Sequence, residues 1–200
     1  MIALSPPTDG CPRAPGRPRD ERASRAITAA ARRQLAELGY ARLSMESVAA
    51  EAGVARATVY RRYRDKADLV TAAIADAEGS LPPAGEDPRQ DLARFLAQFD
   101  ARFAEHCLEV LGALLGARED PRALALHRRR VIEPRLAHAR GLLERARDLG
   151  QLDADADLDL ALQMLVGAVF ARRVAGARSS RGWAERAVDL VWAGMGPAGR

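Results

Sequence analysis

Apolar residues recur along most of this chain at the spacing of an α-helix, and this periodicity limits the fold more than any other feature. In the segment 132–146 the intervals are four, three, four and three, giving Ile132, Leu136, Ala139, Leu143 and Ala146. Such a stripe lies on one face of a helix, and we find no alternating pattern typical of a strand. Aromatic residues make up only 4% of the chain, so Ala, Leu and Val must form the core. We therefore expect an all-α fold.

Glycine, proline and capping residues predict where the helices begin and end. Ser44 suits an N-cap, and Asp87-Pro88 and Asp120-Pro121 each place a capping Asp before a proline at the first helical position. Pro134 is expected to kink or break the helix that contains it. The predicted helices cover residues 24–38, 45–52, 56–63, 66–77, a segment from 88, a segment from 121, residues 132–150, 158–171 and 183–195.

Positive charge is concentrated in the first third of the chain. Residues 1–66 carry 13 basic and 7 acidic side chains, whereas the remaining 134 residues carry 18 and 20. A basic segment joined to a near-neutral one is typical of a protein that binds nucleic acid through one of its parts. Charge alone leaves a solvated basic surface as the alternative.

Residues 45–63 have the spacing of a helix-turn-helix, two short helices separated by a glycine turn. In this motif the second helix lies in the major groove of DNA, with its first residues facing the base edges. Arg56 stands at the start of that helix and can bind guanine through its guanidinium group, and Tyr60 follows one turn later. Arg61 and Arg62 are expected to extend toward the phosphates.

A longer match supports this interpretation. The segment AITAAARRQLAELGYARLSMESVAAEAGVARATVYRRYRDKADL, residues 26–69, resembles the DNA-binding region of TetR-type transcriptional regulators without a gap. The matching positions are Ile27, Ala30, Ala31, Gly39, Tyr40, Ser44, Val48, Ala49, Ala52, Gly53, Val54, Thr58, Val59, Tyr60, Tyr63, Lys66 and Leu69. Three residues depart from the family pattern: Ala55 replaces a capping Ser, Leu43 replaces a common Thr, and Gln34 replaces an apolar residue.

The resemblance implies specific DNA contacts. It assigns contact with base edges to Arg56, Ala57 and Tyr60. It assigns contact with phosphates to Ser44, Thr58, Arg61, Arg62 and Lys66. It also implies a helix-turn-helix domain at 21–68 and a helical regulatory and dimerisation domain at 69–200. Five prolines and three arginines with little to bury predict a flexible Pro/Arg-rich arm at residues 1–20. The arm contains PGRPR, which either enters the minor groove or belongs to a plain tail.

The same resemblance suggests two further sites in the second domain. A cavity for a small apolar effector would be lined by Phe95, Phe99, Phe103, Cys107, Leu111, Met164 and Phe170, although each of these residues also suits plain core packing. The helices 158–171 and 183–195 are apolar on more than one face, which favours a dimer interface, with burial inside one subunit as the alternative. The predicted interface residues are Leu162, Val166, Val169, Trp183, Val188, Val191, Trp192 and Met195.

Other classes of protein find little support in the sequence. The chain has no phosphate-binding loop and no Gly-Xaa-Ser-Xaa-Gly motif, so we expect no enzyme, and its three histidines lack metal-ligand spacing, so we expect neither metal nor cofactor. We find no secretory signal and no apolar stretch long enough to span a bilayer. We expect a cytoplasmic, homodimeric and ligand-responsive repressor that binds a palindromic operator. The alternative is a DNA-binding or architectural protein without an effector.

Overall fold

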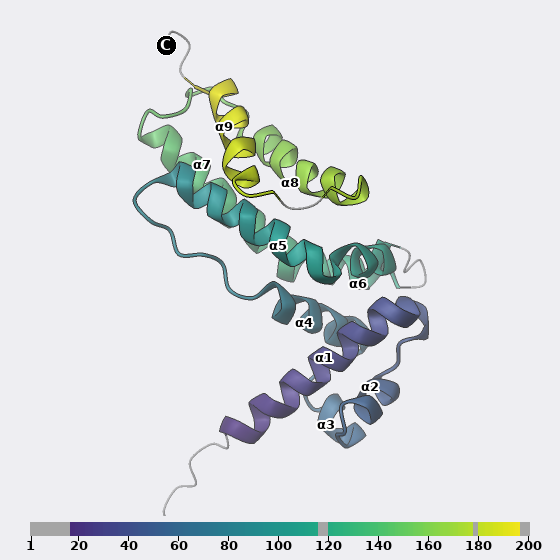
Figure 1. The fold of residues 1–200 in the computed structure, drawn as a ribbon. Helices are drawn as coiled ribbons and strands as arrows, with labels where there is room; N and C mark the ends of the chain where they lie inside the picture. The colour runs from purple at the N-terminus through teal and green to yellow at the C-terminus, as the bar shows by residue number, and fades with distance from the viewer. Residues whose placement is uncertain (1–16, 116–119, 178–179, 197–200) are drawn as a thin grey trace, which may run out of the picture.

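The computed structural model describes residues 17–115, 120–177 and 180–196, which form nine α-helices and one π-helical segment without any strand (Figure 1). The predicted all-α fold is therefore confirmed. In chain order the elements are α1 (Arg17–Arg42), α2 (Met45–Glu51), α3 (Arg56–Tyr60), α4 (Lys66–Glu78), α5 (Pro88–Leu115), α6 (Pro121–His127), η1 (Arg128–Ile132), α7 (Glu133–Asp148), α8 (Leu158–Val174) and α9 (Trp183–Gly194). No helix in these ranges is long and apolar enough to cross a membrane.

Helices α1 to α4 surround the first of two hydrophobic cores. Ile27 and Leu35 of α1, Val48 of α2, Val59 of α3 and Leu69 of α4 are all at most 1% exposed. Helix α6 adds the buried Ala123 to this core and packs the partly buried Leu126 against it. The core therefore fixes the two helices of the predicted helix-turn-helix against the long helix α1.

Helices α5, α7, α8 and α9 enclose the second core. Leu92 and Leu96 of α5 pack there with Leu143 of α7 and with Leu165 and Val169 of α8, all at most 2% exposed. A buried ion pair also joins α5 to α8, because Nη2 of Arg173 lies 2.8 Å from Oδ1 of Asp100. In Figure 1 these helices form the upper layer, above the layer of α1 to α4.

The two layers meet where α1 packs against α5, where α6 and η1 pack against α4, and at the loop between α4 and α5. The hydroxyl of Tyr40, at the end of α1, donates a 2.6 Å hydrogen bond to Oδ2 of Asp120, which is also the N-cap of α6. In the loop, Arg135 of α7 donates to the carbonyl of Gly79 at 2.9 Å, and Arg145 of α7 donates to the carbonyls of Gly85 and Glu86. Side chains of α7 thus hold the loop that leads from the first layer to the second, and Asp120 ties the start of α6 to α1.

Some helix boundaries differ from the prediction. Residues 1–16 of the expected arm lie outside the described residues, but α1 begins at Arg17, so the arm's last four residues are helical. A proline in the first turn of a helix is tolerated, which permits this early start at Arg17-Pro18. Gly39 leaves helical geometry with a φ of 77°, as expected of a stop, but the helix resumes to Arg42. Helix α3 ends at Tyr60, so Arg61 and Arg62 lie in the turn that follows it.

Pro134 neither breaks the helix nor leaves it plainly α-helical. The residues from Arg128 to Ile132 form a π-helical turn, and α7 follows directly with Pro134 in its first turn. Proline cannot donate a backbone hydrogen bond and its ring crowds the carbonyl four residues earlier. The wider π-turn just before it relieves that conflict while the helix continues.

Candidate nucleic-acid interface

Ser44 and the residues around it fix the first helix of the motif. Oγ of Ser44 accepts a 3.0 Å hydrogen bond from the backbone N–H of Ser47, and Oγ of Ser47 accepts one of 3.2 Å from the N–H of Ser44. This reciprocal pair is a capping box. Gln34, which is polar where an apolar residue was expected, is buried but donates to Glu51 at 2.7 Å and accepts from Ser47 at 2.7 Å. The unusual residue therefore ties α1 to α2.

Helix α3 is short and is held from one side only. Gly53 makes the turn before it with a φ of 66°, and the N-cap Ala55 offers no side-chain hydrogen bond. Val59 points inward and is fully buried, and Tyr63 is buried just beyond the helix. The opposite face of α3 is left open to solvent.

That open face carries the predicted base-contact residues. Arg56, Ala57 and Tyr60 are exposed, as is Arg61 in the turn that follows. Within the described residues neither Arg56 nor Arg61 forms a hydrogen bond or an ion pair, so both guanidinium groups are available to a ligand. The hydroxyl of Tyr60 donates a 2.5 Å hydrogen bond to Oε1 of Glu46 on α2.

The Glu46–Tyr60 contact shifts the pKa of both groups. The hydrogen bond from Tyr60 lowers the pKa of the Glu46 carboxyl, and the nearby positive charge of Arg56 adds to this effect. The same bond raises the pKa of the Tyr60 hydroxyl. Both shifts have the direction expected when a carboxylate accepts from a phenol. Sequence analysis missed Glu46, because only the packing of α2 against α3 brings it to Tyr60.

The other predicted phosphate contacts lie nearer to the protein body. The guanidinium of Arg62 donates to the carbonyl of Thr58 at 3.1 Å and to Oγ of Ser24 on α1 at 3.3 Å. Nζ of Lys66 donates to the carbonyl of Tyr40 at 2.9 Å and lies 4.5 Å from the centre of its ring. Both side chains thus fasten the motif to α1. Contact of these residues with phosphate stays a prediction.

Chemically, this surface offers donors to an anionic partner. Arginine binds phosphates and the guanine edge, and a short helix anchored by one buried face can enter a groove with the other. No group of three or more His, Cys, Asp or Glu in the described part of the chain lies close enough to hold a metal ion. The geometry is that of a helix-turn-helix.

Comparison with known proteins agrees with this geometry. The family described as "Bacterial regulatory proteins, tetR family" matches residues 27–73, and the one described as "Tetracyclin repressor-like, C-terminal domain" matches residues 82–191. The HTH-type transcriptional regulator YdeS of Bacillus subtilis is 31% identical over 167 residues, which cover 78% of this chain and 81% of YdeS. The DNA-binding transcriptional repressor TetR of Mycobacteroides abscessus is 32% identical over 146 residues, covering 71% of this chain and 77% of that protein.

A solved structure shares the fold over most of the chain. The transcriptional regulator FadR of Bacillus subtilis, in complex with stearoyl-CoA, superposes with a TM-score of 0.65 at 18% identity, covering 86% of this chain and 98% of FadR. FadR shows the shared fold, and the two domain matches together with YdeS identify the class. The chain belongs to the TetR family of transcriptional regulators, which are DNA-binding proteins and not enzymes.

The residues predicted to line an effector cavity do not all lie together. Phe99 of α5 and Phe170 of α8 pack edge to face with ring centres 6.0 Å apart, and Phe95 is buried against His138 of α7. Met164 requires a correction, because it is 56% exposed on the outer side of α8, where the helical period turns it away from Leu165 and Val169. The side chains of Phe103, Cys107 and Leu111 lie outside the described part of the structure.

The predicted dimer interface also needs correction. Four of its residues are at most 9% exposed and belong to the second core of this chain: Leu162, Val169, Val188 and Trp192. Their side chains are covered by the chain itself and are not available to a partner. Val166 and Trp183 are half-buried, and the ring of Trp183 lies 4.3 Å from the guanidinium of Arg172.

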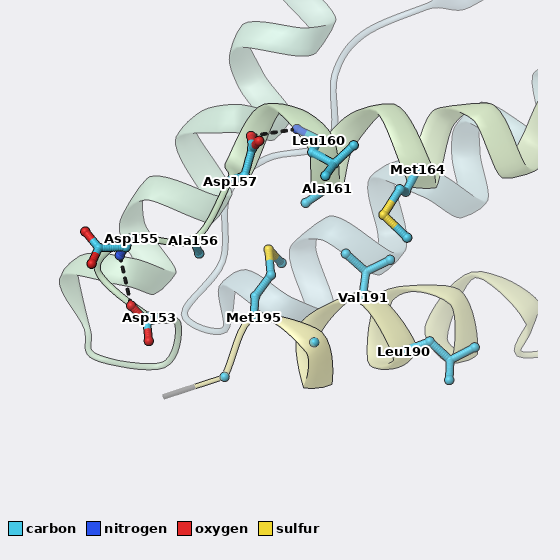
Figure 2. Close-up of a pocket in the computed structure, with 12 residues that line it drawn as sticks. Asp153, Asp155, Ala156, Asp157, Leu160, Ala161, Met164, Leu190, Val191 and Met195 are labelled. Carbon is cyan, nitrogen blue, oxygen red and sulfur yellow. Dashed lines mark hydrogen bonds between the residues drawn. The ribbon is translucent and has the colours of Figure 1, made fainter. Parts of the chain in front are cut away.

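The outer side of α8 and α9 carries a different apolar set. Leu160 and Met164 of α8, Leu190 and Val191 of α9 and the C-cap Met195 are among the residues that line an open hollow of about 650 Å³ (Figure 2). Leu160 is 51% exposed and Leu190 is 78% exposed. Sequence analysis did not select these two residues. The helical period of each helix, counted from its buried positions, is the signal that marks them as outward-facing.

Proposed function

We propose that this chain is a cytoplasmic, homodimeric repressor that binds an approximately palindromic operator and releases it when a small apolar effector binds. The observation that carries the proposal is the exposed face of α3. Arg56 and Tyr60 of this helix and Arg61 just after it all lie open to solvent. In this proposal residues 21–68 form the DNA-binding domain and residues 69–200 form the regulatory and dimerisation domain. Residues 1–20 form an arm.

The proposed DNA contacts follow from the position of each side chain. Arg56, Ala57 and Tyr60 meet base edges, and Ser44, Thr58, Arg61, Arg62 and Lys66 meet phosphates. In a dimer, two copies of α3 must lie about 34–36 Å apart to enter successive major grooves of one duplex. Arg61 suits the phosphate role best, because its guanidinium has no competing partner in the described residues.

A second copy of the chain is proposed to cover the outer face of α8 and α9. Large exposed apolar side chains are uncommon in such a cluster on a monomer, and here Leu160, Met164 and Leu190 are each more than half exposed. Val191 and Met195 adjoin them at the hollow. Burial of this face by its symmetry mate would give an isologous interface, in which both subunits use the same patch.

The effector is proposed to bind between α5 and α8. The aromatic pair Phe99–Phe170 joins these helices, and Phe95 lies one turn earlier on α5. The related fold of FadR is known in complex with stearoyl-CoA, which supports a ligand with a long apolar part. Such a ligand releases DNA only if it binds more tightly to the form of the dimer in which the two α3 helices are wrongly spaced.

The test begins with selection of the operator from a random duplex library by the purified protein. Arg56→Ala is then expected to bind the selected operator about 1–3 kcal/mol more weakly and with relaxed sequence preference. Arg128→Ala is the matched control, since it removes the same charge from an exposed position on η1, away from α3. Equal binding by Arg56→Ala and the wild type would refute the base-contact assignment.

Release is tested with a panel of long-chain acyl compounds. A ligand at 100 times its dissociation constant should raise the free energy of unfolding by about 2.7 kcal/mol and displace the operator. If a compound stabilises the protein, Phe170→Ala should weaken that effect. If no compound stabilises the protein or displaces DNA, the chain binds DNA without an effector, which is the alternative function.

A further inference from the structure

Glu46 and Tyr60 form a pair on the side of the helix-turn-helix that carries the open face of α3. Tyr60 lies at the last position of α3, and Glu46 lies in the first turn of α2. The tyrosine hydroxyl donates to the carboxylate at 2.5 Å, while the side chain of Tyr60 as a whole remains 51% exposed. The phenol oxygen is therefore engaged by the protein and still within reach of solvent or a partner.

This contact limits the further hydrogen bonds that the phenol oxygen can form. A tyrosine hydroxyl has a single proton to donate, and its oxygen can also accept. When that proton points at Glu46, only the lone pairs of the oxygen remain for a third group. An ionised carboxylate has no proton to give, so the pair has no second arrangement in which Glu46 is the donor. The lowered pKa of Glu46 and the raised pKa of Tyr60 agree with a proton held on the phenol.

Arg56 on the same face has the opposite hydrogen-bonding character to the Tyr60 oxygen. Its guanidinium offers donors only and has no partner among the described residues. It stands one helical turn before Tyr60, and its charge attracts Glu46. The exposed face of α3 thus presents a pure donor at its start and a pure acceptor at its end.

We propose that Glu46 is a specificity-determining residue, which makes Tyr60 an acceptor for the exocyclic amino group of adenine or cytosine. In the major groove these amino groups, N6 of adenine and N4 of cytosine, are the only base-edge donors, whereas thymine O4 and guanine O6 accept. A Tyr60 held by Glu46 therefore favours an amino group at its position and disfavours a keto oxygen. Arg56 selects guanine at another position of the same half-site. The inference rests on the proposed function and deepens it.

The test removes single amino groups from the DNA. In the operator selected by the wild type, each adenine is replaced in turn by purine, which lacks the 6-amino group, and each cytosine by pyrimidin-2-one, which lacks the 4-amino group. We expect one position per half-site at which the wild type binds about three- to tenfold more weakly, the effect of one hydrogen bond. Tyr60→Phe, which lacks the hydroxyl, should be insensitive to the same replacement.

Glu46→Ala separates the role of the carboxylate from that of the phenol. Without Glu46 the hydroxyl can rotate to donate, so binding should become tolerant of a keto oxygen at the Tyr60 position. Removing a negative charge from a surface that meets phosphates should also strengthen binding to random duplex at low salt. A residue that only supports the fold would not raise non-specific binding while lowering discrimination.

Arg61→Ala is the matched control. It should weaken binding to all duplexes and retain the full sensitivity to the amino group. The proposal is overturned if the wild type selects an operator but Tyr60→Phe or Glu46→Ala keeps that sensitivity unchanged. A wild type that selects no sequence overturns the proposed function itself, and the two failures are therefore distinguishable.

Discussion

Gly53 holds the turn between α2 and α3 in a conformation that other residues rarely adopt. Its φ is +66°, and a Cβ placed on it meets no atom within 4 Å, so the cost of a side chain is backbone strain rather than crowding. Gly53→Ala is therefore expected to lower the free energy of unfolding by about 1 kcal/mol, measured by urea denaturation. Gly141→Ala adds the same methyl group to an exposed site in the middle of α7, again with no atom within 4 Å. The free energy of unfolding of that variant should rise by about 0.5–1 kcal/mol. Equal effects of the two substitutions would contradict backbone strain at Gly53.

The element scale begins with the two helices of the motif, which start very differently. Ser44 caps α2 with a capping box, whereas Ala55 at the start of α3 has an extended backbone but no side-chain cap. Ala55→Ser should therefore add a cap and stabilise the protein by about 0.5–1 kcal/mol, while Ser44→Ala should cost about 1 kcal/mol. Thermal unfolding of the two single variants measures both effects. A destabilised Ala55→Ser protein would mean that the serine hydroxyl cannot reach the N–H groups of α3.

His127, the last residue of α6, makes stability depend on pH. It is 6% exposed, and burial lowers the pKa of its imidazole. In the unfolded chain a histidine titrates near pH 6.5, so between about pH 6.5 and the lower pKa of the folded state only the unfolded chain binds the proton. The free energy of unfolding should then fall as the pH drops below about 6.5, because protons favour the state that binds more of them. In His127→Leu this part of the pH dependence should be absent from urea denaturation curves recorded between pH 5 and 7.5. If the pH dependence of the free energy of unfolding is unchanged in His127→Leu, titratable groups other than His127 cause it.

The sequence predicted those features of the helices, such as caps, turns and first residues, that depend on neighbouring residues in the chain. The cap at Ser44, the turn at Gly53 and the starts at Pro88 and Pro121 depend on neighbouring residues, and each was found where expected. The faces of α8 could not be assigned in the same way, because its apolar residues surround the helix almost completely. Only packing against α5 and α7 shows that Leu162 is inside. The pairing of Glu46 with Tyr60 is tertiary as well, and no local pattern predicts it.

For the whole molecule, the proposed assembly depends on the exposed face of α8 and α9. Leu190→Asp would place a charge on a residue that is 78% exposed in the single chain, so the fold should be retained. In a dimer the same charge would be buried without a partner, so we expect at least about tenfold weaker dimerisation, or about 1.4 kcal/mol. Sedimentation at several concentrations measures the effect. Leu136→Asp changes an exposed leucine of α7 and should leave the assembly state unchanged. A Leu190→Asp protein that associates as the wild type does would exclude this face as the interface.

The π-helical turn from Arg128 to Ile132 sets the rotational phase between α6 and α7. An α-helix advances by about 100° per residue, so removing one residue from this turn would swing α6 by about that angle relative to α7. Ala123, now packed with the core of α1 to α4, would then face elsewhere, and Asp120 would leave the hydroxyl of Tyr40. The extra residue in the π-helical turn thus determines which side of α6 faces helices α1 to α4.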